Sequence, residues 1–92
     1  MDIKHFKTLR KNYGTLAATR ILICQEARVD VLQADTYIGE LVEEHGMGAV
    51  EKMTSKSLFA FAKSVVKQIR DEKKHLLPLV EQRFIKTIMS KN

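Results

Sequence analysis

The sequence predicts an all-α protein, a compact bundle of four to five helices that forms one domain over residues 1–92. Apolar residues recur every three or four positions nearly throughout, and no segment alternates as a strand does. The chain has one proline and four glycines, which leaves long stretches free to be helical. With 45% apolar and 29% charged residues, its composition is that of a folded globular protein and not of a disordered one.

Two helices are expected in the first third of the chain. Ile3, Phe6 and Leu9 are spaced by three residues, which predicts a helix over residues 2–12 that ends or breaks at Gly14. A second helix is predicted from about Thr15 to Arg28. Its expected inward residues are Leu16, Ala17, Ile21, Cys24 and Ala27.

A third helix is expected from Val31 to His45. Asp30 and Gln33 form a capping-box pattern at its start, and Gly46 is typical of a helix C-terminus. The residues expected to be buried are Val31 or Leu32, Ala34, Ile38, Leu41 and Val42. The alternative is one long helix over residues 15–45. Residues 47–53 are expected to form a short turn or helix.

The fourth helix is expected to begin after a Thr54 or Ser55 cap and to end near Lys74. Its apolar face comprises Leu58, Phe61, Ala62, Val65 and Ile69, flanked by Phe59 and Val66. Pro78 lacks an amide hydrogen, which predicts a break or kink around residues 74–77. A last helix is expected from Pro78 to Met89, and it presents Leu77, Val80, Phe84, Ile85 and Ile88.

Charge favours a polyanionic partner. Sixteen Lys and Arg residues outnumber eleven Asp and Glu residues, which gives a net charge of +5. The charges are also segregated along the chain: residues 1–24 and 52–92 are basic, whereas residues 25–51 hold seven acidic residues and one basic residue. A helical bundle could preserve this separation in space.

The strongest candidate site is a basic stripe on the fourth helix. Its members fall within roughly 60° of helical arc, and they are Lys56, Lys63, Lys67, Arg70 and Lys74. Lys4, Lys7 and Lys11 form a second, shorter stripe on the first helix. Like charges at helical spacing repel, so a stripe without an acidic residue predicts binding to a polyanion. Because lysine dominates, we expect contact with the nucleic-acid backbone, DNA or RNA, rather than readout of base sequence.

Two other functions stay open. The protein is alternatively a small regulatory or inhibitory protein that binds another protein, which could itself be a nucleic-acid enzyme. Glu40, Glu43 and Glu44, which share one helix face at spacings of three and four, would then suit a basic partner. The third alternative rests on Arg70 and His75, which stand five apart and resemble the Arg-x4-His signature of HEPN-type ribonucleases. The resemblance covers six residues and implies that this pair contacts the scissile phosphate and assists proton transfer.

We expect no catalytic residues in the leading interpretation, no metal site and no cofactor. Cys24 stands alone among apolar neighbours and predicts a buried thiol without a disulfide. The sequence has neither the apolar run of a signal peptide near Met1 nor a membrane span, so a cytoplasmic location is expected. A homodimer is also expected, with residues 15–45 at the interface near Ile21, Ile38 and Leu41.

Overall fold

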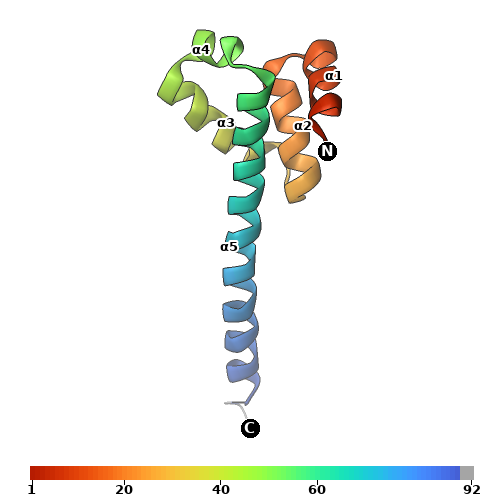
Figure 1. The fold of residues 1–92 in the computed structure, drawn as a ribbon. Coiled ribbons are helices and arrows are strands. Elements are labelled where there is room, and N and C mark those ends of the chain that lie inside the picture. Colours follow the sequence, from red (N-terminus) through yellow and green to blue (C-terminus); the bar gives the residue numbers. More distant parts are fainter. Residues whose placement is uncertain (90–92) are drawn as a thin grey trace.

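The computed structural model describes the backbone of residues 1–89 and the side chains of residues 1–73. This part of the chain is entirely helical, with five helices and no strand, which confirms the predicted fold class (Figure 1). The helices are α1 (Ile3–Tyr13), α2 (Thr15–Ala27), α3 (Val31–His45), α4 (Met47–Lys52) and α5 (Ser55–Met89). The first four gather around one half of α5, while its other half extends beyond them, so the molecule measures 60 × 26 × 17 Å.

Three helices begin at side-chain caps that satisfy free amide groups of the first turn. The amide of His5 donates to Asp2 Oδ1 at the start of α1, over 2.8 Å. Gln33 donates in the same way to Asp30 Oδ1 at the start of α3, over 2.8 Å, so the predicted Asp30 cap is confirmed. Of the two candidates before α5, Thr54 is the cap, because its Oγ1 accepts from the amide of Ser57.

Backbone torsions explain where the chain turns between helices. Gly14 and Gly46 adopt φ values of +98° and +83°, a region that side chains disfavour, and both end a helix as the sequence predicted. Arg28 is the one non-glycine residue in the described part of the chain with positive φ, at +55°. It ends α2, so the alternative of a single helix over residues 15–45 is wrong.

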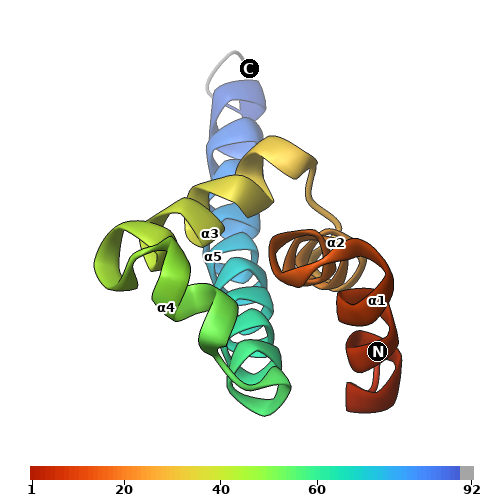
Figure 2. The same ribbon diagram turned by 90° about the horizontal axis from the view of Figure 1, so that it is seen from above.

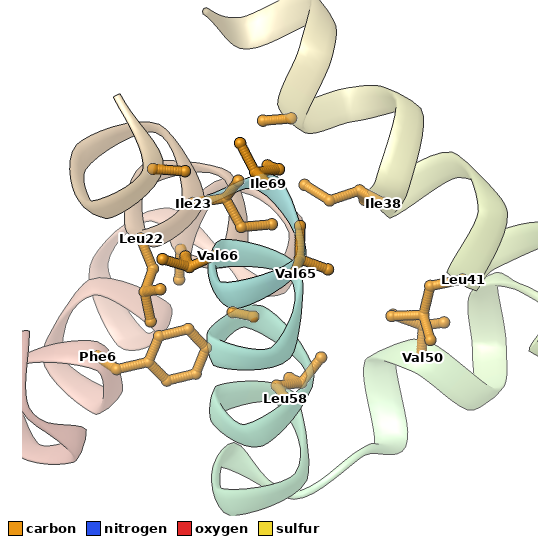
Figure 3. Close-up of a cluster of buried hydrophobic side chains, with 14 residues drawn as sticks. Phe6, Leu22, Ile23, Ile38, Leu41, Val50, Leu58, Val65, Val66 and Ile69 are labelled. Atoms are coloured by element: carbon orange, nitrogen blue, oxygen red, sulfur yellow. The ribbon is translucent and has the colours of Figure 1, made fainter. Parts of the chain in front are cut away.

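The hydrophobic core lies where α1, α2, α3 and α4 meet the first half of α5 (Figure 3). Its fully buried residues include Phe6, Leu22, Ile23, Val50, Leu58 and Ile69. The predicted apolar face of α5 is confirmed at Leu58, Ala62, Val65 and Ile69, and the flanking Val66 is buried too.

The predicted inward face of α2 was largely wrong. Ala27 is buried as predicted, but the expected Leu16, Ala17, Ile21 and Cys24 are only half-buried, and Ala18, Leu22 and Ile23 are buried instead. The physical reason is that α2 packs against α1, α3 and α5, so it is apolar on most sides and its periodicity does not single out one face.

The start of α3 also differs from expectation. Ala34, Ile38 and Leu41 are buried as predicted, but Val31 and Leu32 are 50% and 79% exposed. The first turn of α3 follows directly on the loop from α2, and both side chains there point to solvent rather than into the core.

Of the break or kink predicted near Pro78, the break is wrong, and so is the separate last helix from Pro78, because α5 runs as one helix from Ser55 to Met89. A proline inside a helix loses the hydrogen bond to the carbonyl four residues earlier, and its ring crowds that carbonyl. In α5 the turns on either side continue the helix nonetheless. The consequence is that the two predicted segments share one helical phase.

Candidate anion-binding surface

The basic stripes of α1 and α5 lie on neighbouring helices. The rings of Phe6 and Phe59 meet edge to face with centroids 5.8 Å apart. One turn further along α1, Arg10 Nη1 donates to Ser55 Oγ over 3.0 Å. The contact point moves forward on α1 and backward on α5, so the two helices are antiparallel.

A hydrogen-bonded network around Arg10 fixes this pair of helices to the rest of the bundle. Arg10 Nε donates to Thr15 Oγ1 over 3.2 Å, and Arg10 Nη2 donates to the carbonyl of Glu51 over 2.9 Å. Thr15, which is only 5% exposed, donates in turn to Glu51 Oε2 over 3.0 Å. One guanidinium therefore ties α1, α2, α4 and α5 together, and Arg10 is not free for a ligand.

The structure supplies Lys63 with an acidic partner that the sequence of α5 does not contain. Lys63 Nζ lies 2.6 Å from Glu26 Oε1 of α2 and 5.2 Å from the centre of the Phe59 ring. Both side chains are at least partly buried, with Glu26 18% and Lys63 38% exposed. Lys63 is thus held against the protein itself.

Glu26 is the acidic centre of this contact. Its Oε2 also lies 3.1 Å from the amino group of Met1. Burial by itself raises the pKa of the Glu26 carboxyl, but the hydrogen bonds and positive charges of Lys63 and Met1 outweigh that effect and lower the pKa from its usual 4.5. The carboxylate is therefore ionised at neutral pH.

Arg70 and Lys73 bind the end of α2. Arg70 Nη2 donates to the carbonyl of Glu26 over 3.0 Å, and Lys73 Nζ donates to the carbonyl of Ala27 over 3.1 Å. The last carbonyls of a helix lack partners within the helix and carry the negative end of its dipole, so cations stabilise them there. Two of the five stripe residues, Lys63 and Arg70, are accordingly engaged within the chain.

The remaining basic residues face solvent. Lys4, Lys7 and Lys11 of α1 and Lys56 and Lys67 of α5 are all exposed. None of them has an ion-pair partner among the described side chains. Arg10 of α1 is hydrogen-bonded to Ser55 of α5, and Lys11 and Lys56 are the next residues along the chain. The lysines of α1 and those of α5 therefore come close together at this end of the helix pair. The side chain of Lys74 lies outside the described residues.

The structure also separates the opposite charges in space. Seen along α5, helices α1 and α4 lie on opposite sides of it, and α3 runs from beside α2 toward α4 (Figure 2). The exposed acids Glu40, Glu43 and Glu44 belong to the half of α3 next to α4, away from the lysines of α1. The acids in the second half of α3 and the lysines of α1 therefore lie on different sides of the molecule.

The structure also describes most of the aromatic residues and the cysteine that the sequence singled out. Phe59 and Phe61 are half-buried against the core, as expected of packing residues, while the side chains of Phe84 and His75 lie outside the described part. Burial raises the pKa of the half-buried Cys24 thiol.

Within the described residues we find no pocket and no cluster of His, Cys, Asp or Glu that could hold a metal ion.

Two of the three residues expected at the centre of a dimer interface are buried within the chain, while Ile21 is half-buried. Ile38 and Leu41 are 4% and 7% exposed because they pack in the core of their own chain.

None of the described helices is both long and apolar enough to cross a membrane.

Comparison with other proteins gives no further constraint: the chain matches no protein-family model, no curated protein and no solved structure.

Proposed function

We propose that the protein is a non-catalytic nucleic-acid-binding protein that contacts the phosphate backbone through exposed lysines of α1 and α5. The observation that carries the proposal is the set of five solvent-facing lysines on two adjacent antiparallel helices: Lys4, Lys7, Lys11, Lys56 and Lys67. The part of this surface on α1 contains no acidic residue.

This set is smaller than the one the sequence suggested. Glu26 relieves part of the repulsion along the stripe, and Arg70 has a structural role at the end of α2. Reversing the charges of Lys63, Lys67 and Arg70 together would therefore break contacts inside the protein as well as any contact with a ligand. The exposed lysines give the cleaner test.

Separation of charge adds a second line of support. The acidic side of α3 would be repelled by a polyanion, while the side formed by α1 would be attracted to it. The molecule would therefore approach nucleic acid in one orientation. Lysines present point charges without the bidentate geometry that reads guanine, so binding should depend little on base sequence.

The test is equilibrium binding to duplex and single-stranded DNA and RNA over a range of salt concentrations. Each lysine that neutralises a phosphate contributes about 0.9 to the slope of log K against log salt for duplex DNA. Lys7→Gln, Lys11→Gln and Lys67→Gln should each weaken binding and reduce that slope.

Gln68→Glu is the matched control for Lys67→Gln. Both substitutions lower the net charge by one, but Gln68 is about 100° further round α5, away from the lysines. The proposal requires that Lys67→Gln weaken binding more than Gln68→Glu does. Equal effects would mean that only net charge matters, and undetectable binding at low salt would refute the proposal.

A regulatory protein that docks on another protein is the second candidate. The observation that favours it is the exposed acidic group Glu40, Glu43 and Glu44, which has no role in nucleic-acid binding. Under this alternative, substitution of these three residues by Gln would abolish binding to the partner protein. The lysine variants would leave that binding intact.

A further inference from the structure

The apolar face of α5 does not end where the bundle ends. Inside the bundle that face buries Leu58, Ala62, Val65, Val66 and Ile69. Because α5 is one continuous helix, its phase is maintained beyond Ile69. At 100° per residue, positions 76, 80 and 84 fall on the same side as Ile69, within an arc of roughly 80°. These positions are Leu76, Val80 and Phe84.

The second half of α5 extends away from the other helices. Lys73, which binds the end of α2, marks the edge of the bundle, and the helix beyond it has no neighbouring helix in the described part of the chain (Figure 1). From Lys74 to Met89 this segment is about 24 Å long. In proteins most of the stability of a helix comes from packing of its apolar face rather than from helix propensity. A covering surface would supply that packing.

A second apolar feature lies at the same edge. Val31 and Leu32, in the first turn of α3, are 50% and 79% exposed. Lys73 also lies 3.5 Å from the carbonyl of Arg28, and Tyr37 donates to Glu72 over 3.4 Å, which places the start of α3 beside the point where α5 leaves the bundle. The exposed pair therefore adjoins the root of the extending segment.

Charge identifies what fits this surface. Residues 74–89 contain three basic residues and one acidic residue. Residues 29–45 contain five acidic residues and neither Lys nor Arg. The basic segment extends away from the α3 of its own chain, so it cannot pair with that acidic segment. Two of these acids, Asp30 and Asp35, belong to the part of α3 beside the root of the extending segment, and the end of a second copy's α5 would reach them if the α5 helices ran antiparallel.

We propose that two copies of this chain associate through the extending halves of α5 in an antiparallel, two-fold symmetric pair. The end of each α5 then reaches the first turn of the partner's α3, where apolar surface and acidic residues adjoin. In a parallel pair each basic residue would lie level with its own copy, and the end of α5 would not reach the partner's α3. This dimer uses other residues than the proposed nucleic-acid contacts, so either proposal can fail without the other.

Sedimentation equilibrium at micromolar concentration tests the pair. The wild-type chain, of 10.6 kDa, should sediment with twice its mass. Val80→Glu should shift it to the single-chain mass, while Gln82→Glu, with the same new charge on the other side of α5, should leave the dimer intact. A wild-type protein at the single-chain mass at every concentration would overturn the proposal, as would a dimer that withstands Val80→Glu.

A substitution at an exposed position separates association from folding. Leu32 is 79% exposed, so Leu32→Glu should leave helicity unchanged and weaken the dimer at least tenfold. Gln33→Glu, at the neighbouring exposed residue, is its matched control and should weaken the dimer less than twofold. Equal effects of the two substitutions would show that the first turn of α3 is not in the interface, contrary to the proposal.

The antiparallel direction has its own measurement. In a Cys24→Ser background, a spin label at Ser64→Cys would lie about 26 Å along α5 from the middle of the extending segment. Two such labels should therefore be about 50 Å apart in the antiparallel dimer, by double electron–electron resonance. A distance below about 30 Å would indicate parallel helices and overturn the proposal.

Discussion

The ion pair between Glu26 and Lys63 is expected to stabilise the fold, and its removal tests whether Lys63 serves the protein or a ligand. The two charged groups are 2.6 Å apart and partly shielded from solvent. Hydrogen bonds to charged groups contribute about 1.5–3 kcal/mol when well shielded, and exposed ion pairs contribute about 0.2–1 kcal/mol. With Lys63 38% exposed, we expect Glu26→Gln to lower the free energy of unfolding by about 1.5 kcal/mol.

Thermal unfolding followed by circular dichroism measures this change. For a domain of this size 1 kcal/mol corresponds to about 4–8 °C, so Tm should fall by about 6–12 °C. Lys63→Met keeps the apolar stem over Phe59 and removes the charge, and the double variant completes a thermodynamic cycle. The coupling energy should be about 1 kcal/mol. Glu40→Gln, at an exposed carboxylate, should change stability by less than about 0.5 kcal/mol.

The pH dependence gives an independent check with a defined sign. The pKa of Glu26 is lower in the folded chain than its usual 4.5, so the contribution of the carboxylate is complete above that value. It is lost as the pH falls through the lowered pKa of the folded state. The difference between wild type and Glu26→Gln should thus be constant near pH 7 and shrink below about pH 4.5. A coupling energy of zero, or a difference that persists in acid, would refute the reasoning.

Two further predictions follow from single contacts, and a third tests the ribonuclease alternative. Thr15→Val removes the buried hydroxyl between Arg10 and Glu51 and should cost about 1–3 kcal/mol in urea unfolding, whereas loss of less than 0.5 kcal/mol would exclude a role for that network. Asp30→Ala removes the cap of α3 and should cost about 1 kcal/mol, while Asp30→Asn should restore most of it, a pattern that fails if the cap is not formed. His75→Ala should leave nucleic-acid binding unchanged, and neither the wild-type protein nor the variant should cleave RNA. If the wild-type protein cleaves RNA and the variant does not, the ribonuclease alternative is established.

Local signals in the sequence were sufficient for the helices. Asp30 and Gly46 predicted the two ends of α3, because a side-chain cap and a positive φ act within one turn of the chain. Likewise, Thr54 and the spacing of Leu58, Ala62 and Val65 predicted the start and the buried face of α5. Each of these features depends on neighbours a few residues away, which the sequence lists in order.

Packing determined what local signals could not. The buried face of α2 depends on three helices around it, and its own periodicity predicted Ile21 where Leu22 and Ile23 are buried. The continuity of α5 through Pro78 likewise depends on whether adjacent turns support the helix, and a local proline rule predicted a break.

The candidate site illustrates the same division. The sequence by itself determined that the lysines of α1 and α5 form stripes and that the middle of the chain is acidic. Only the tertiary structure decided which stripe residues stay free, because Glu26 and the end of α2 are 37 to 44 residues from Lys63 and Arg70 in the chain. Ion pairs between helices depend on distances in space of a few ångströms, and those distances are fixed by packing rather than by separation along the sequence.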